Sequence, residues 1–130
     1  NKAIELKPDL PDSYIQLARV LEAENKSADA KKLMDKAVSI LSSNADILFE
    51  DGRISYNLKQ MDAAEKLFNT VIAINPNYAN AYYSLGLIYQ GRGDTAKALA
   101  AFQKARDIAG PNADLDKLIE SLKGAPAPKK

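Results

Sequence analysis

Residues 79–112 read ANAYYSLGLIYQGRGDTAKALAAFQKARDIAGPN, and this stretch decides the fold. Its apolar and small residues recur three or four positions apart on both sides of a short polar break at 91–94. That spacing places the apolar side chains on one face of a helix. Within the break, Gly93 suits a helix C-terminus and Asp94 suits an N-cap, so the stretch predicts two helices joined by a tight turn.

The same pattern recurs along the chain at an interval of 34 residues. Small and apolar residues fall into register at this interval: Ala30, Ala64 and Ala98; Met34, Phe68 and Phe102; Ala37, Val71 and Ala105; Ile40, Ile74 and Ile108. A single helix pair would leave its apolar stripe exposed, so successive pairs must stack on one another. The register predicts helices at 11–24, 28–41, 45–58, 62–74, 79–91 and 95–108, with Ser27 as the N-cap of the second.

Within residues 79–112, aromatic, Leu-Gly, Tyr, Ala and Phe positions follow the order typical of tetratricopeptide repeats. The residues that carry this pattern are Tyr82, Leu85, Gly86, Tyr89, Gly93, Ala98, Phe102 and Ala105. The chain therefore resembles the tetratricopeptide repeat family, over about 110 residues in all. The resemblance implies an all-α fold, an α–α superhelix in which antiparallel helix pairs form a right-handed solenoid.

The resemblance also implies how the chain is organised. The expected parts are the end of a helix from a truncated upstream repeat at 1–8, three full repeats at 11–44, 45–78 and 79–112, a capping helix at 113–123 and a disordered tail at 124–130. The capping helix is amphipathic, with Leu115, Leu118, Ile119 and Leu122 on its apolar side. The tail lacks any apolar periodicity, which is why we expect no packed structure there.

The composition argues against several kinds of chemistry. The chain has no Cys and no His, which excludes cysteine nucleophiles, histidine acid–base catalysis and the usual zinc sites. Its formal charge is only +1, with acids and bases interspersed, whereas a nucleic-acid surface needs a clustered basic excess. Its longest apolar stretch is too short to cross a bilayer. We therefore expect no enzyme activity, no metal or other cofactor, no nucleic-acid partner and no membrane insertion by this segment.

In tetratricopeptide domains the first helix of each pair lines a concave groove, and the resemblance implies the same here. The expected groove residues are Asp12, Ile15, Arg19, Glu22 and Ala23, then Asp46, Phe49, Arg53, Tyr56 and Asn57, then Asn80, Tyr83, Leu87, Gln90 and Gly91. Because Arg19 and Arg53 recur one repeat apart, an extended peptide or a helix with an acidic group is the expected ligand. The alternative is that this face packs against other parts of a parent chain or against a second copy.

One familiar ligand is disfavoured by the residues at the matching positions. Chaperone-binding members of the family grip a C-terminal carboxylate with Lys, Arg and Asn from successive first helices. The matching positions here are Ile15, Arg19, Glu50, Asn80 and Ser84. Only Arg19 is positive and Glu50 would repel a carboxylate, so a chaperone C-terminal tail is not the expected partner.

The expected function is a protein-interaction scaffold that binds a peptide or a helix of an unidentified partner. One alternative is a regulatory or assembly appendage of a larger protein, such as a bacterial membrane protein or enzyme. A second is weak self-association through an apolar edge around Ile4 and Leu6, at the truncated N-terminal end. A cytoplasmic location is favoured, with an extracytoplasmic part of a larger protein as the alternative.

The middle repeat departs from the pattern on a face expected to be buried. Asp51 stands where the other copies have Leu17 and Leu85, and Ser55 follows one helical turn later. An unpaired buried carboxylate would cost several kcal/mol. Asp51 is therefore expected to reach water or a donor such as a Tyr hydroxyl or a Lys, in a structural role.

Overall fold

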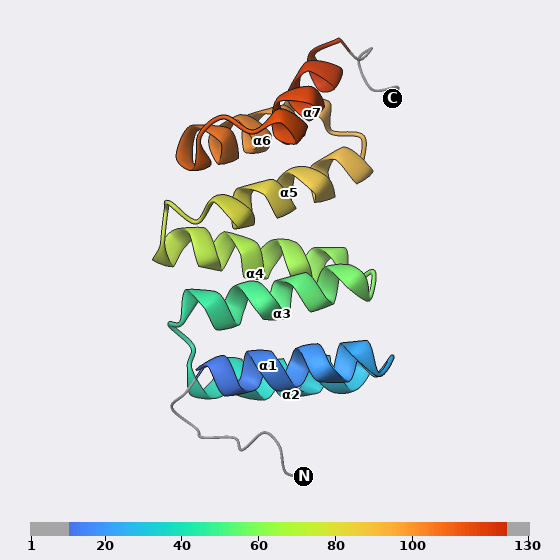
Figure 1. Cartoon of the computed structure of the whole chain (residues 1–130), viewed down its shortest axis with the longest axis vertical. Helices are drawn as coiled ribbons and strands as arrows, with labels where there is room; N and C mark the ends of the chain where they lie inside the picture. The colour runs from blue at the N-terminus through green and yellow to red at the C-terminus, as the bar shows by residue number, and fades with distance from the viewer. Residues whose placement is uncertain (1–10, 125–130) are drawn as a thin grey trace. The chain divides into compact units, whose positions relative to one another are not determined.

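The computed structural model describes residues 11–124, and this part of the chain is helical apart from its short connections (Figure 1). Its helices are α1 (Pro11–Ala23), α2 (Ser27–Ile40), α3 (Ala45–Asn57), α4 (Met61–Ile74), α5 (Ala79–Gly91), α6 (Thr95–Ala109) and α7 (Ala113–Lys123). Each begins and ends within one residue of the position expected from the register, which confirms the all-α fold class. The segment at 1–8, with Ile4 and Leu6, lies outside the described residues, as do residues 125–130 of the tail expected at 124–130.

The helices form two compact units, each described by itself. Unit 1 holds α1 to α4 and unit 2 holds α5 to α7. Paired helices lie side by side within each unit: α1 with α2, α3 with α4, and α5 with α6 (Figure 1). None of the helices within residues 11–124 has the length and apolar character needed to span a membrane.

The tight turns inside the three helix pairs share one backbone geometry. Asn25, Lys59 and Gly93 each have a positive φ, of 65°, 65° and 79°. In each turn the next amide donates to a carbonyl five residues back, as in the 2.9 Å bond from the Asp94 amide to the Tyr89 carbonyl. This is the hydrogen-bond pattern of a Schellman turn, in which glycine is the unstrained residue. Gly93 therefore fits the turn, and Lys59 adopts it at a cost of about 1 kcal/mol.

The residues after these turns begin the second helix of each pair. Asp94 is the N-cap of α6, as expected, because its side chain accepts a hydrogen bond from the Lys97 amide at 3.2 Å. The expectation for Ser27 is wrong by one residue. Lys26 is the N-cap of α2 and makes no side-chain capping bond, while Ser27 is the first helical residue. The reason is that the Lys26 carbonyl already accepts the first helical bond, from the Ala30 amide at 3.0 Å.

Each unit is held by its own buried cluster. In unit 1 the cluster joins α1, α2 and α3 through Tyr14, Ala18, Ala30, Met34, Ala37, Ile47 and Ile54. In unit 2 it joins α6 and α7 through Ala98, Phe102, Ala105, Leu115, Ile119 and Leu122. The apolar side expected for α7 is thus the side that packs on α6, with Leu118 also packed against the cluster.

Each unit contains a close contact between a glycine and a phenylalanine ring. A Cβ atom added at Gly52 would lie 2.7 Å from the Phe68 ring, and one added at Gly86 would lie 2.5 Å from the Phe102 ring. Both rings are almost completely buried. The glycines therefore let α3 approach α4, and α5 approach α6, closely enough for a ring to lie against the backbone.

Candidate functional site

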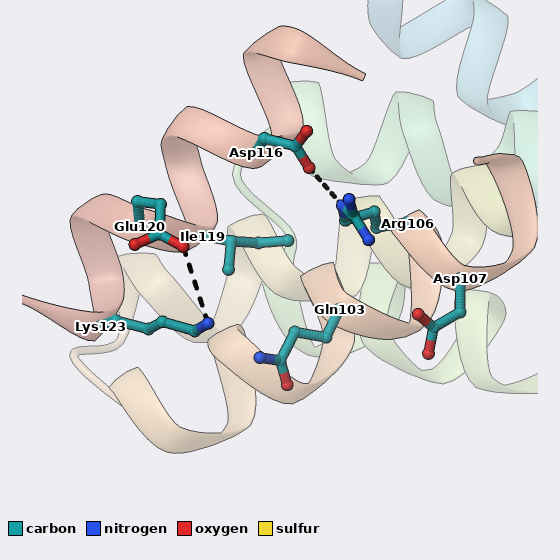
Figure 2. Close-up of a pocket in the computed structure, with 7 residues that line it drawn as sticks. All are labelled: Gln103, Arg106, Asp107, Asp116, Ile119, Glu120 and Lys123. Atoms are coloured by element: carbon teal, nitrogen blue, oxygen red, sulfur yellow. Dashed lines mark hydrogen bonds and ion pairs between the residues drawn. The ribbon is translucent and has the colours of Figure 1, made fainter. Parts of the chain in front are cut away.

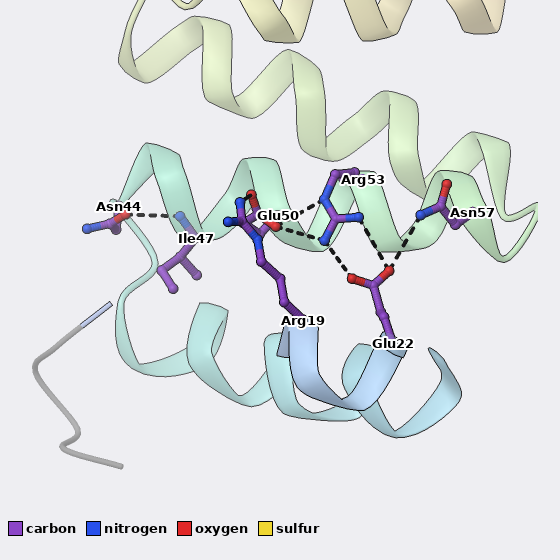
Figure 3. A network of polar contacts seen from close by, with 7 residues as sticks. All are labelled: Arg19, Glu22, Asn44, Ile47, Glu50, Arg53 and Asn57. Atoms are coloured by element: carbon purple, nitrogen blue, oxygen red, sulfur yellow. Dashed lines mark hydrogen bonds and ion pairs between the residues drawn. The ribbon is translucent and has the colours of Figure 1, made fainter. Parts of the chain in front are cut away.

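The first helices of unit 1 carry a network of ion pairs on one face (Figure 3). We call this the first-helix face of unit 1, and its residues are Arg19 and Glu22 on α1 and Glu50, Arg53 and Asn57 on α3. The helices α1 and α3 contact each other, which brings residues 31 positions apart in sequence within bonding distance. The face therefore joins repeat 1 to repeat 2.

Glu50 lies at the centre of this network. Its side chain is only 8% exposed, and both of its oxygens accept hydrogen bonds from arginines. Arg19 Nη2 lies 3.0 Å from Oε2, while Arg53 Nε and Nη2 lie 3.0 Å and 2.9 Å from Oε1. Two cations thus compensate one nearly buried carboxylate, so its burial does not leave an unpaired charge.

Arg53 also joins α3 to Glu22 of α1. Its Nη2 lies 2.7 Å from Glu22 Oε1 and its Nη1 lies 3.3 Å from Oε2, a two-point contact that fixes the guanidinium plane. Burial alone would lower the pKa of Arg53, but the hydrogen bonds and charges of Glu22 and Glu50 raise it above its ordinary value. Arg53 is therefore permanently charged and held by this chain's own carboxylates.

This arrangement bears on the two arginines expected to receive an acidic ligand. Both Arg19 and Arg53 are paired with carboxylates of the same unit. Arg19 keeps 63% of its side chain exposed, whereas Arg53 keeps 31%. An acidic ligand would have to compete with Glu50 and Glu22 for these groups, although a binding role for either arginine stays a prediction.

The other expected groove residues of unit 1 fall into two groups. Asp12, Ala23, Asp46 and Asn57 are exposed, and Tyr56 is half-buried. Ile15 packs against the buried cluster of unit 1, and the Phe49 ring lies 5.5 Å from the ring of Phe68. The aliphatic and aromatic members thus contribute to packing as well as to the surface.

In unit 2 the expected residues Asn80 and Tyr83 line a pocket of about 300 Å³. The pocket, called here the α5–α7 pocket, is bounded by Ala79, Asn80, Tyr83, Ala105, Ala109, Asn112, Asp114 and Leu115. Tyr83 packs its ring 5.6 Å from that of Phe102 and still leaves 40% of its surface exposed. Of the remaining three, Leu87 packs against the buried cluster of unit 2, while Gln90 and Gly91 are exposed.

A second hollow of about 530 Å³ lies between α6 and α7 (Figure 2). Its walls are mostly charged or polar: Gln103, Arg106, Asp107, Asp116, Ile119, Glu120 and Lys123. Arg106 pairs with Asp116, and Lys123 lies 3.7 Å from Glu120. The sequence did not predict this hollow, because the apolar spacing of α7 shows which side packs and not where its charged residues lie relative to α6. The four-residue spacing of Asp116 and Glu120 on one stripe was the available signal.

The buried carboxylate of the middle repeat has the kind of partner expected for it. The Asp51 side chain is 3% exposed, and its Oδ1 lies 3.0 Å from Nζ of Lys31 on α2, although no well-aligned hydrogen bond from the described residues reaches that oxygen. Lys31 also pairs with Asp35. Burial raises the pKa of Asp51 from its ordinary 3.8 to about 7; Asp35 adds to the rise and Lys31 opposes it. Ser55 donates its hydroxyl to the Asp51 carbonyl at 2.9 Å.

Within residues 11–124 there is no group of three or more acidic side chains placed to hold an ion. What the two units do offer is surface: an ion-paired face on α1 and α3, and a pocket with an exposed aromatic ring on α5.

Comparison with known proteins identifies the family. A family model described as Tetratricopeptide repeat matches residues 45–110, and a second with the same description matches residues 11–41. The chain belongs to the tetratricopeptide repeat family. The predicted family and fold class are thereby confirmed, because solved members of this family are solenoids of paired helices.

Curated relatives are larger proteins that contain similar repeats. The chain is 29% identical over 94 residues to human protein O-mannosyl-transferase TMTC3, covering 72% of this chain and 10% of the relative. It is 33% identical over 78 residues to small glutamine-rich tetratricopeptide repeat-containing protein 2 of Saccharomyces cerevisiae, covering 60% of this chain and 22% of the relative. The chain thus spans between a tenth and about a fifth of the length of these relatives.

Solved structures share the fold. A crystal structure of MamA is similar with a TM-score of 0.79 at 25% identity, covering 89% of this chain and 68% of that one. The first tetratricopeptide domain of Spaghetti (RPAP3), solved with the HSP90 peptide SRMEEVD, has a TM-score of 0.81 at 15% identity, covering 93% and 96%. At 15% identity the second likeness concerns the fold alone.

Proposed function

We propose that the chain is a protein-interaction scaffold that binds a peptide or a helix of a partner on the first helices of its repeats. The observation that carries the proposal is Tyr83, a large aromatic side chain that is 40% exposed at the wall of the α5–α7 pocket. Exposed aromatic rings beside pockets are typical anchor points for partners, because they bury much area and lose little side-chain entropy.

The family supports the same role. A structural relative in this family holds a peptide, the HSP90 segment named above. Binding of this kind needs a presented surface and no catalytic step, so we also propose that the chain has no enzyme activity of its own. The other groove residues expected from the sequence, from Asp12 on α1 to Gln90 on α5, stay part of this proposal.

The network on unit 1 bears on which ligand to expect. Glu50 stands at one of the positions that hold a chaperone carboxylate in other family members, and here it is 8% exposed between two arginines. A carboxylate ligand would have to displace it. This supports the proposal that a chaperone C-terminal tail is not the partner.

Site-specific photo-crosslinking tests the proposed face. A photoreactive phenylalanine analogue is placed at Tyr83 and, in a matched control, at Lys104, which is exposed on the second helix of the same repeat. The expected result is that a discrete protein crosslinks through position 83 and not through position 104. Equal crosslinking at both positions, or none at position 83, would contradict the proposal.

A second candidate is a regulatory or assembly module within a larger protein. The observation in its favour is that the chain covers only 10% to 22% of the relatives described above. In that case the ligand of the first-helix surface is another segment of the parent protein. Crosslinks from position 83 would then be intramolecular in the full-length protein, which mass spectrometry distinguishes from crosslinks to a separate chain.

A further inference from the structure

The α5–α7 pocket has walls suited to an extended aliphatic chain. Ala79, Ala105 and Ala109 come from α5 and α6, and their small side chains leave the space open. The Tyr83 ring and Leu115 supply larger apolar surface. A methylene chain lying against these apolar walls would be removed from water, which is favourable.

The pocket has two neutral amides and one negative charge among its lining residues. Asp114 is the only charged residue among those that line it, and no ion pair within residues 11–124 includes Asp114. Asn80 and Asn112 supply side-chain amides, although Asn112 already accepts the Leu115 amide at 2.9 Å as the N-cap of α7. The pocket therefore offers a carboxylate without a cation of its own.

The arginine of α6 does not supply that cation. Arg106 pairs with Asp116 and lines the hollow between α6 and α7, whose residues are distinct from those of the α5–α7 pocket (Figure 2). The N-terminus of α7 is also unfavourable for binding an anion. Its first turn carries Asp114 and Asp116, which already offset the positive end of the helix dipole.

We propose that the α5–α7 pocket binds the side chain of a lysine or an arginine from the partner peptide. The aliphatic stem lies against Tyr83 and the alanines, and the cationic head pairs with Asp114. An ammonium or guanidinium group beside an exposed tyrosine ring gains a further cation–π attraction. This inference rests on the proposed function, and it assigns the partner a basic residue, where the sequence alone favoured an acidic one.

The test starts from a heptapeptide display library selected on the whole chain. The inference expects the enriched peptides to share a lysine or an arginine at one position. A synthetic consensus peptide is then measured by fluorescence anisotropy with that residue intact, changed to norleucine, and changed to glutamate. Because norleucine keeps the aliphatic stem and loses the charge, it separates the contribution of Asp114 from that of the apolar walls.

Protein variants locate the contact. Asp114→Asn should weaken binding of the basic peptide roughly twofold to fivefold and leave the norleucine peptide unchanged, since an exposed ion pair is a weak interaction. Asp114→Lys should shift the preference towards the glutamate peptide. Asp107→Asn removes one carboxylate from α6 outside the pocket, and it should leave the affinity for all three peptides unchanged. Circular dichroism confirms that each variant is folded.

The outcomes separate this inference from the proposed function. Peptides that bind without a basic position, or whose affinity is the same for Asp114→Asn and wild type, would overturn the inference and leave the scaffold role standing. An acidic consensus that binds better to Asp114→Asn would overturn it in favour of an anion. A selection that enriches no peptide would contradict the scaffold role itself, and this inference with it.

Discussion

Repeats 2 and 3 solve one packing problem in the same way and differ in the residues beside it. In repeat 2 Gly52 lies against Phe68, and in repeat 3 Gly86 lies against Phe102. Next to the glycine, repeat 3 has the buried Leu85, whereas repeat 2 has the buried Asp51. The close contact between glycine and phenylalanine is therefore the same in both repeats. The buried position next to the glycine is apolar in one repeat and charged in the other, and the charge has Lys31 as its partner.

Repeat 1 has a second pair of residues at the same two positions, within one buried cluster. Ala18 takes the place of the glycine, and the buried Met34 takes the place of the ring. An unbranched, flexible side chain can lie beside a methyl group where a rigid ring cannot. The three repeats thus suggest that the small residue and the large one vary together.

The largest effect is expected from removing the rings that the two repeats share. Phe68→Ala and Phe102→Ala should each lower the free energy of unfolding by about 3–5 kcal/mol, because each empties a fully buried site. Urea unfolding followed by circular dichroism measures the loss. A loss below about 1 kcal/mol for either variant would mean that the contact does not hold that repeat together.

The next effect concerns Asp51, the residue in which repeats 2 and 3 differ. Asp51→Leu copies repeat 3 and should raise the free energy of unfolding by about 1–4 kcal/mol near neutral pH, because apolar packing replaces a buried ion pair. The melting temperature should rise with it. An unchanged or lower melting temperature would show that the contact with Lys31 already compensates the buried carboxylate.

The same position predicts a dependence on pH. The pKa of Asp51 is about 7 in the folded chain against an ordinary 3.8, so between these values the folded state holds a proton that the unfolded state has lost. Wild-type stability should therefore fall as the pH rises from about 4 to about 7, and the advantage of Asp51→Leu should grow over that range. Asp107→Asn, at an exposed carboxylate, should show no such growth when unfolding is measured across the same range.

The glycines test whether small and large residues vary together. Gly52→Ala and Gly86→Ala should each cost about 1–3 kcal/mol, since the added methyl group meets a ring that has little room to move. Gly91→Ala, which meets nothing within 4 Å, is the control and should not destabilise. The double variant Gly52→Ala/Phe68→Met copies repeat 1. If it is no more stable than Gly52→Ala alone, the idea of paired variation is wrong.

The smallest effect is on the surface of repeat 3. Lys97 lies with its Nζ 5.6 Å from the centre of the Tyr89 ring, while repeat 2 has Ser55 at the position of that tyrosine. Lys97→Gln should lower the free energy of unfolding by about 0.5–1 kcal/mol at most, because an exposed cation–π contact is weak. The corresponding change in repeat 2 is Ala63→Gln, which removes no such contact. If Ala63→Gln lowers the free energy of unfolding as much as Lys97→Gln does, the cation–π explanation is wrong.

Much of the fold could be predicted because it depends on local chemistry. Helical spacing and the turn at Gly93 fix where α5 and α6 begin and end. The pairing of Asp51 was foreseen only as a type of partner. That the partner is Lys31 depends on how α2 packs on α3. The repeat register predicts that these helices are neighbours, but it does not give the distances between their side chains.

The candidate site was less predictable. The positions on the first helices follow from helical period, and Asn80 and Tyr83 do line a pocket. The helical period does not, however, predict which charges surround these positions. Arg19 and Arg53 look available in the sequence, yet Glu22 and Glu50 hold them, because α1 and α3 bring residues 31 positions apart together. Likewise Asp114 borders the pocket only because α7 packs on α6.

The sequence by itself thus determined the family and the seven helices within residues 11–124. These depend on the spacing of apolar and small residues, which acts over a few turns of helix. The tertiary structure alone decided which charges are neutralised and which remain available. Electrostatic pairing depends on distances of about 3–4 Å between side chains of different helices, and only the packed chain sets those distances.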